Sequence, residues 1–309
     1  MMDFKGADVL STQGFSKGDI DKVMEVADGF LPYAKKEKTS DLLDGFVLAT
    51  LFYEPSTRTR LSFDTAMQRL GGRVISAIGM ETSSLSKGET LSDTARVIQT
   101  YADVIAVRHP APGAPAEMAE AIDIPVLNAG DGAGEHPTQA LLDLFTIKNE
   151  RGALDGLTVA LVGDLKFGRT VHSLVYVLSH YNVNLILVSP DKLKMPQEIM
   201  ADLSENNVSV TETESLEEAL EKCDVCYMTR VQKERFDDPE EYERLKHYYV
   251  LTKGLVEKYN PEMTIMHPLP RIGEISLDTD ELSGAAYFRQ MVSGVAVRMA
   301  LLALVLGKA

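Results

Sequence analysis

The chain has 309 residues, of which 45% are hydrophobic and 25% are charged, and this composition excludes a disordered protein. Its length suits two domains of ordinary size. Its formal net charge of -15 excludes the basic surface that nucleic-acid binding requires, so basic residues must gather locally if the ligand is a small anion.

Short β-branched runs alternate with helical patterns along the whole chain. In the first half we expect strands at Val47–Tyr53, Arg73–Ala77, Val104–Val107 and Val126–Asn128. The helices expected after them are Thr57–Leu70, Leu91–Tyr101, Ala116–Ala121 and Pro137–Glu150. Further strands are expected at Thr158–Val162, Leu185–Val188, Ser209–Thr211, Val225–Thr229 and Met263–Met266. This alternation predicts an α/β protein with two doubly wound parallel-sheet domains and helices on both faces.

The segment Arg151-Gly-Ala-Leu-Asp-Gly156 is the natural break between the two sheets, which places the domains at residues 1–150 and 151–287. The most apolar stretch, Met291 to Leu306, contains Gly294 and Arg298 and is shorter than the ~20 residues of a membrane span. Its apolar residues recur at helical spacing, so we expect a buried terminal helix, residues 288–309, that packs back on the first domain. A membrane partner is not expected.

Two cysteines, Cys223 and Cys226, are the only ones in the sequence. A zinc site would need further ligands at matching spacing, so no metal is expected. The strand expected at this point would send the two side chains to opposite faces of its sheet. The low cysteine count and a start without an apolar signal region predict a cytoplasmic protein.

The strongest local motif is Phe52-Tyr-Glu-Pro-Ser-Thr-Arg-Thr-Arg60, between an expected strand and an expected helix. A helix N-terminus offers unpaired N–H groups and a positive dipole end to an anion. Three hydroxyls add donors, and Arg58 adds a planar fork that matches a phosphate. An ordinary helix cap would explain the Ser-Thr pair alone, whereas the whole motif favours a phosphate site.

A second motif, Gly163-Asp-Leu-Lys-Phe-Gly-Arg-Thr170, opens the second half. It has Arg169 where a nucleotide P-loop needs lysine, and it lacks the second glycine of a dinucleotide-binding turn. Both ATP and NAD are therefore excluded as cofactors. A tight turn that directs Arg169 toward a carboxylate remains.

Three further segments place donors or basic groups at strand ends of the first half. They are the polar loop Thr82–Thr90 with Lys87, the segment Arg108-His-Pro110, and Gly134-Glu-His-Pro-Thr-Gln139 with His136 and Gln139. Each has an ordinary structural explanation when taken singly. Together they build the local positive field that an acidic chain needs for an anionic ligand.

Over essentially its whole length the chain resembles the catalytic chains of the aspartate/ornithine carbamoyltransferase family. The motifs that carry the resemblance are Ser56-Thr-Arg-Thr-Arg60, Lys87-Gly-Glu-Thr90, Arg108-His-Pro110, Leu127-Asn-Ala-Gly-Asp-Gly132, His136-Pro-Thr-Gln139, Gly163-Asp-Leu-Lys166, Gly168-Arg-Thr-Val-His-Ser173, Met228-Thr-Arg-Val-Gln-Lys-Glu-Arg235 and His267-Pro-Leu-Pro-Arg271. The ornithine branch typically has His-Cys-Leu-Pro where this chain has His267-Pro-Leu-Pro270, so the resemblance is to the aspartate branch.

The resemblance implies carbamoyl transfer from carbamoyl phosphate to aspartate, the committed step of pyrimidine synthesis. The residues it assigns to carbamoyl phosphate are Ser56, Thr57, Arg58, Thr59, Ser83, Lys87, Arg108, His136, Gln139, Leu269 and Pro270. Those with a catalytic role are Arg58, Thr59, Lys87, Arg108 and His136, and those for aspartate are Lys87, Arg169, Arg230 and Gln232. Glu54 is expected to pair with Arg169 and Arg235 when the domains close, and the Leu269–Pro270 peptide bond is expected to be cis.

The resemblance further implies a homotrimer with shared active sites, in which Lys87 reaches a neighbouring subunit. Some members join separate regulatory chains, and the sequence leaves open whether this one does. No cofactor is implied. Two alternatives are carried beside the aspartate reaction: ornithine carbamoylation, and a non-catalytic metabolite-binding scaffold. The proton acceptor also stays open between Lys87 and the departing phosphate.

Overall fold

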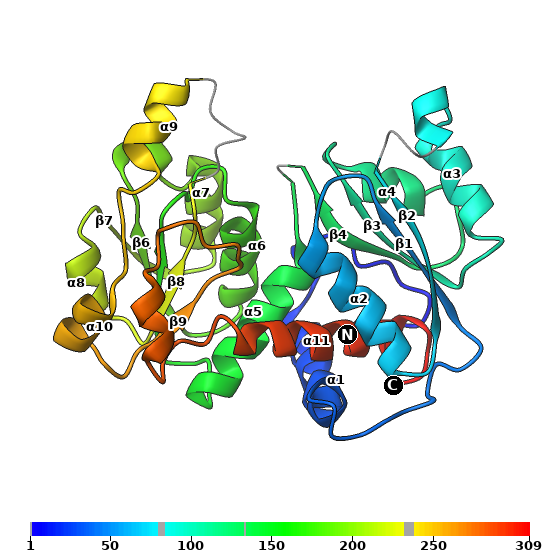
Figure 1. The fold of residues 1–309 in the computed structure, drawn as a ribbon, viewed down its shortest axis with the longest axis horizontal. Helices are drawn as coiled ribbons and strands as arrows, with labels where there is room; N and C mark the ends of the chain where they lie inside the picture. Colours follow the sequence, from blue (N-terminus) through cyan, green and yellow to red (C-terminus); the bar gives the residue numbers. More distant parts are fainter. Residues whose placement is uncertain (1, 80–83, 133, 232–237) are drawn as a thin grey trace. The chain divides into compact units, whose positions relative to one another are not determined.

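The computed structural model describes residues 2–79, 84–132, 134–231 and 238–309. The chain divides into two compact units, unit 1 formed by Met1–Phe145 with Met291–Ala309, and unit 2 formed by Thr146–Gln290 (Figure 1). Each unit is built around its own parallel sheet. The predicted α/β class is therefore confirmed.

Unit 1 contains a four-stranded sheet with the order β2-β1-β3-β4, and its pairings are all parallel. The strands are β1 (Val47–Phe52), β2 (Arg73–Ile78), β3 (Val104–His109) and β4 (Val126–Asp131). All four were predicted, but β3 and β4 run further at their carboxyl ends than the apolar runs. The extensions contain Arg108, His109 and Asp131, which are polar residues that periodicity assigns to loops.

Helices cover both faces of this sheet. They are α1 (Lys17–Ala34), α2 (Thr57–Arg69), α3 (Leu91–Ile98), α4 (Ala114–Ala119), the start of α5 (Pro137–Arg151) and most of α11 (Arg289–Val305). Alternate residues of β1 and β3 pack against α3 and α4 in one buried cluster. On the opposite face, Thr50 of β1 donates to Asp64 of α2 at 3.1 Å. This two-sided burial explains why β1 and β3 read as nearly continuous apolar runs.

Unit 2 contains a five-stranded parallel sheet with the order β7-β6-β5-β8-β9. Its strands are β5 (Thr158–Val162), β6 (Asn184–Val188), β7 (Ser209–Thr213), β8 (Val225–Met228) and β9 (Thr264–Met266). The helices are α6 (Arg169–Leu178), α7 (Gln197–Glu205), α8 (Leu216–Leu220), α9 (Pro239–Leu245) and α10 (Lys253–Tyr259). Residues of α8 and α10 share one buried cluster with β5, β6, β8 and β9.

The two cysteine side chains were expected on opposite faces of the sheet, and this expectation was wrong. Cys223 and Cys226 are both buried free thiols in the same apolar cluster of unit 2. The reason is that β8 begins at Val225, so Cys223 lies before the strand and the alternation of faces does not reach it. Their ordinary packing in the core is as expected.

The C-terminal helix α11 packs on unit 1, as predicted. Its Arg298 is 3% exposed and donates to Ser62 of α2 at 3.0 Å and to Thr138 of α5 at 3.3 Å. The guanidinium also lies 5.0 Å from the Phe63 ring centre. Burial lowers the pKa of Arg298 to about 10, while the nearby Asp143 acts against this shift. None of the helices in the described part of the chain combines the length and apolar character of a membrane span.

We expect Arg298→Met to lower the free energy of unfolding by about 3–5 kcal/mol. The substitution keeps much of the apolar volume but leaves Asp143, which is fully buried, without the compensating positive charge. The control is Arg96→Met, since Arg96 forms a surface pair with Asp93 at 3.6 Å and should change stability by less than about 1 kcal/mol. Urea unfolding of both variants measures the difference, and equal effects would contradict a special role for Arg298.

Candidate functional site

The predicted phosphate motif lies at the carboxyl end of β1 and forms the start of α2. Thr57, Arg58 and Thr59 are the first three residues of the helix, and Ser56 is its N-cap residue. The Ser56 side chain makes no capping hydrogen bond, and the first turn contains no acidic residue. By contrast, Ser16 and Thr90 cap α1 and α3 with their side chains. The start of α2 therefore presents hydroxyl, N–H and guanidinium donors suited to an anion.

Arg108 lies near the end of β3, next to β1, because Phe52 and Arg108 are partners in the parallel register. The pairing of β3 with β4 shifts between Val107 and His109, so Arg108 sits at an irregularity of the ladder. Such irregularities often redirect a side chain beside a binding site. The Arg108 guanidinium forms an ion pair with Glu54 at 2.8 Å, and the two side chains are 11% and 29% exposed.

The Glu54–Arg108 contact is one that sequence reasoning missed. Glu54 was expected to pair with Arg169 and Arg235; Arg235 lies outside the described residues, and Arg169 belongs to the other unit. The ion pair within unit 1 follows from the parallel register, which places the segments after β1 and β3 side by side. The available signal was an acidic residue two positions after β1, next to the phosphate motif, with Arg108 on the neighbouring strand β3.

His136 directly precedes α5, Gln139 lies in its first turn, and both are buried. The turn before them is organised by Asp131, whose carboxylate accepts from the backbone N–H groups of Gly113 at 2.8 Å and Glu135 at 2.7 Å. The Gln139 side-chain N–H donates to Asp143 at 2.9 Å, so the Gln139 side-chain oxygen points away from Asp143. The role of Asp131 was not predicted, because its two backbone partners become neighbours only in the fold.

Lys87 ends the short 3-10 helix Ser84–Lys87 and is exposed. No hydrogen bond or ion pair joins its amine to another residue in the described part of the chain. Ser83, which was predicted to contact phosphate, lies outside the described residues. Within the described ranges, the structure therefore brings Lys87 to no partner in its own chain.

In unit 2, Arg169 is the first residue of α6. The tight turn predicted in the motif Gly163–Thr170 ends at Gly168, directly before it. Gly163 has φ +120°, and a Cβ there would lie 2.4 Å from the Thr229 carbonyl oxygen. A Cβ on Gly168 would lie 2.4 Å from the Asp164 carbonyl oxygen. Both glycines are therefore needed to close the turn that places Arg169 at the carboxyl edge of the sheet.

Arg230 lies two residues after Met228, the last residue of β8, and is half-buried. Two further predicted residues lie outside the described residues: Gln232, which was predicted to bind the substrate aspartate, and Arg235, which was predicted to pair with Glu54. Leu269 and Pro270 follow β9, and the peptide bond between them is cis, as predicted. Arg169, Arg230 and Leu269 thus all follow parallel strands of one sheet.

A small pocket lies at this carboxyl edge of unit 2. Gly163, Pro190 and Thr229, which follow three different strands, line it together with the charged residues Lys246 and Glu274. This is where ligands bind in open α/β sheets. Among the described residues there is no cluster of His, Cys, Asp or Glu that could hold a metal ion.

Two family models match the chain. The model described as "Aspartate/ornithine carbamoyltransferase, carbamoyl-P binding domain" matches residues 7–149. The model described as "Aspartate/ornithine carbamoyltransferase, Asp/Orn binding domain" matches residues 155–305. Together they span nearly the whole sequence.

Similar proteins from archaea carry one name, "Aspartate carbamoyltransferase catalytic subunit". The protein of Methanothrix thermoacetophila is 54% identical over 96% of this chain and 97% of its own length. That of Thermococcus kodakarensis is 51% identical over 99% of both chains.

Solved structures also match nearly the whole chain. The catalytic subunit of M. jannaschii aspartate transcarbamoylase is 49% identical, with a TM-score of 0.89 over 96% of both chains. The aspartate transcarbamoylase of Trypanosoma cruzi, solved with carbamoyl phosphate and aspartate, is 42% identical, with a TM-score of 0.92 over 98% of both chains.

We expect Glu54→Gln to tighten the binding of inorganic phosphate about tenfold. The carboxylate competes with an anion for Arg108, and a largely buried ion pair of this kind is worth about 1–2 kcal/mol. Calorimetric titration measures the dissociation constant. The matched control is Asp93→Asn, which removes the surface partner of Arg96 and should leave phosphate affinity unchanged. Unchanged affinity in the Glu54 variant would show that Arg108 does not bind the anion.

Proposed function

The chain belongs to the aspartate/ornithine carbamoyltransferase family, and we propose that it transfers the carbamoyl group of carbamoyl phosphate to the amino group of L-aspartate. The products are N-carbamoyl-L-aspartate and phosphate, and the reaction is the committed step of de novo pyrimidine synthesis. The observation that carries this proposal is the 54% identity, over nearly the full length, to a protein named as an aspartate carbamoyltransferase catalytic subunit.

Unit 1 binds carbamoyl phosphate. The phosphate is held by Ser56, Thr57, Arg58 and Thr59 at the start of α2 and by Arg108 at the end of β3. The name of the family model that matches residues 7–149 supports this assignment. Phosphate binding displaces Glu54 from Arg108, so the carboxylate and the ligand compete for one cation. In this chain of net charge -15, the Glu54 carboxylate neutralises the Arg108 guanidinium as long as no phosphate is bound.

The carbamoyl carbon becomes tetrahedral as the aspartate amine attacks it, and its oxygen gains negative charge. Thr59, Arg108 and His136 donate to that oxygen, and fixed donors of this kind are typically worth ~3 kcal/mol each. Gln139 and the carbonyl oxygens of Leu269 and Pro270 accept from the carbamoyl amide. Rate enhancement then comes from orientation and electrostatics rather than from a covalent intermediate. Either the departing phosphate or Lys87 takes the proton of the amine.

Unit 2 binds aspartate. Arg169, Arg230 and Gln232 contact its two carboxylates, and Lys87 adds a further contact. The family model for residues 155–305 is named for aspartate or ornithine binding, so it does not choose between these substrates. The names of the similar proteins and the segment His267-Pro-Leu-Pro270 favour aspartate over ornithine. A non-catalytic scaffold is disfavoured because the residues expected at the site are all present in the sequence.

The assembly is a homotrimer with shared active sites. The exposed Lys87, whose amine has no partner among the described residues of its own chain, supports a contact with a neighbouring subunit. The word "subunit" in the names of the relatives fits an assembly and leaves room for a regulatory chain. Two buried free thiols suit the reducing cytoplasm as the place of action.

Phosphate release from carbamoyl phosphate tests the reaction itself. We expect release to depend on L-aspartate and to be absent with ornithine in its place. Carbamoylation of ornithine would establish the sister reaction instead. Binding of both substrates without any turnover would favour the scaffold.

We expect Arg230→Ala and Arg58→Ala to divide the two substrates between them. Arg230→Ala should raise KM for aspartate and leave carbamoyl phosphate affinity near normal. Arg58→Ala should weaken carbamoyl phosphate binding by about 1.5–3 kcal/mol, which is roughly tenfold or more, because a charge-assisted contact to phosphate is lost. Titration with carbamoyl phosphate and aspartate saturation curves measure both effects, and equal loss of carbamoyl phosphate affinity in the two variants would contradict the division.

The trimer is tested with mixed subunits of two inactive variants, Lys87→Ala and His136→Ala. Every mixed ring contains one junction where an intact pocket meets an intact Lys87 loop. With equal random mixing about three quarters of the rings are mixed, and each has one good site in three, so activity should recover to roughly a quarter of wild type. If subunit exchange is demonstrated and activity stays at the parental level, Lys87 acts within its own chain.

A further inference from the structure

The loop after β9 contains a buried histidine and a buried glutamate that contact each other. His267 is fully buried and Glu274 is 4% exposed, and the His267 Nε2 atom lies 2.7 Å from Glu274 Oε1. The two residues are the first and last of the loop segment 267–274. Their contact therefore closes the loop at its base, inside unit 2.

The other ring nitrogen of His267 fixes Leu269. Its Nδ1 atom accepts from the backbone N–H of Leu269 at 2.7 Å. An acceptor nitrogen carries no proton, so the imidazole is neutral and its proton is on Nε2, which donates to Glu274. Leu269 has φ +57°, a left-handed conformation that costs a side chain of this kind about 1–2 kcal/mol. The hydrogen bond to His267 holds the residue in this conformation.

Glu274 makes a second hydrogen bond within the loop, through its other carboxylate oxygen. Its Oε2 atom accepts from the backbone N–H of Ile272 at 3.0 Å. Burial alone would raise the pKa of Glu274, but the hydrogen bond from His267 and the backbone donors outweigh burial and lower it. One ionised carboxylate therefore orients the imidazole and fixes the residue two places after Pro270.

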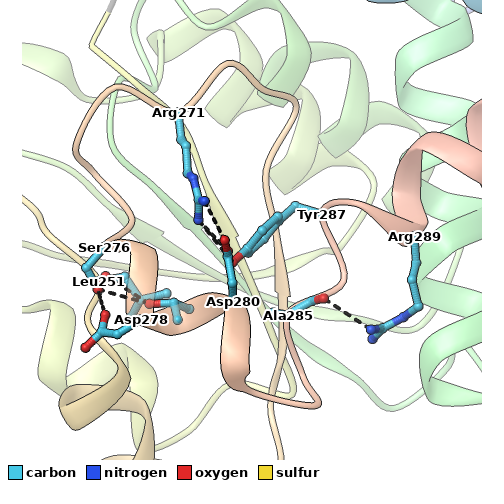
Figure 2. A network of polar contacts seen from close by, with 9 residues as sticks. Leu251, Arg271, Ser276, Asp278, Asp280, Ala285, Tyr287 and Arg289 are labelled. Carbon is cyan, nitrogen blue, oxygen red and sulfur yellow. Dashed lines mark hydrogen bonds and ion pairs between the residues drawn. The ribbon is translucent and has the colours of Figure 1, made fainter.

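Further side chains hold the flanks of the segment. The backbone N–H of His267 donates to the side chain of Gln290 at 3.1 Å. Figure 2 shows Arg271 directed at Asp280. The two terminal guanidinium nitrogens of Arg271 lie 2.5 and 2.6 Å from the Asp280 carboxylate oxygens, and the Tyr287 hydroxyl also donates to Asp280. The backbone N–H groups of His267, Leu269 and Ile272 thus donate to side chains. In a strand they would donate to the backbone carbonyls of a neighbouring strand.

We propose that His267 and Glu274 are a positioning pair, which sets the carbonyl oxygens of Leu269 and Pro270 and so selects an acyl phosphate that carries an amide. The inference rests on the proposed function, in which these two oxygens, together with Gln139, accept from the N–H groups of the carbamoyl amide. It assigns the two residues no contact with the substrate. A group without N–H donors in the same place would gain nothing from the aligned carbonyls.

A role for His267 as the base that deprotonates the amine is inconsistent with this geometry. Nε2 is bonded to Glu274 and Nδ1 to the Leu269 N–H, and the side chain is fully buried. A general base needs a nitrogen within reach of the proton it takes. The two residues act through the backbone between them.

The test compares carbamoyl phosphate with acetyl phosphate, which has a methyl group in place of the amide. Dissociation constants of both, and of inorganic phosphate, are measured by calorimetry for the full-length wild type and for His267→Gln, His267→Asn and Glu274→Gln. The His267→Asn variant keeps an acceptor near the Nδ1 position, whereas His267→Gln keeps a donor near Nε2. Glu281→Gln is the control, because Glu281 pairs with Lys253 at 2.8 Å on the surface of the same unit.

We expect His267→Gln to weaken carbamoyl phosphate about tenfold, the effect of one lost hydrogen bond at a binding site. His267→Asn should recover part of that loss, and Glu274→Gln should fall between them. The dissociation constants of acetyl phosphate and inorganic phosphate should change by less than about twofold in all variants. Neither ligand has an amide N–H that the aligned carbonyl oxygens could accept. The control should match the wild type.

Equal weakening of carbamoyl phosphate and acetyl phosphate would mean that the pair only stabilises the fold, and unchanged carbamoyl phosphate affinity would mean that it positions nothing. Either result overturns the inference and leaves the proposed function standing if the wild type still turns over both substrates. A wild type that binds no carbamoyl phosphate would overturn both. Glu274→Gln keeps size and shape, so it provides the decision if the His267 variants do not fold.

Discussion

The parallel arrangement of the strands is the constraint on which the rest of this molecule depends. In a parallel sheet every strand ends at the same edge, so residues far apart in sequence meet there without any special device. In unit 1 this edge joins the segments after β1 and β3, and the register pairs Phe52 with Arg108. Glu54, two residues beyond Phe52, then lies 2.8 Å from the Arg108 guanidinium. The electrostatics of the proposed phosphate site therefore follow from strand register.

That ion pair shows how an acidic chain can maintain a cationic site. Isolated buried charge is costly, and the penalty falls when a partner of opposite sign is close. Arg108 is 11% exposed and has Glu54 as its partner, whereas the hydroxyl of Ser56 makes no capping bond. The start of α2 and the end of β3 therefore differ: the first has an N-cap hydroxyl that makes no capping hydrogen bond, and the second has an arginine that is paired with a carboxylate of the same unit.

The sequence predicted the fold well because the signals were local. Buried parallel strands are continuous apolar runs, and strands β1, β5 and β8 were found at or near their true ends. The helix α1 was missed, although its capping box, Ser16 with Asp19, is readable. In the site, the residue types were predicted but their partners were not. Asp131 contacts Gly113 and Glu135, and His267 contacts Glu274, across loops whose conformation no periodicity describes.

The partners that the sequence could not supply share one physical task. A loop at a strand end has backbone N–H groups that no neighbouring strand can accept, and leaving them unpaired in a buried place is costly. Unit 1 solves this with the carboxylate of Asp131, and unit 2 solves it with Glu274 and the imidazole of His267. A carboxylate can accept several N–H groups at once, which one backbone carbonyl in a ladder does not do. An irregular segment held in this way is as specifically placed as a strand residue, yet its carbonyl oxygens stay available for a ligand. Under the proposed function, Glu274 therefore does not oppose the binding of an anionic substrate, because it fixes the backbone whose carbonyl oxygens accept from the neutral amide of that substrate.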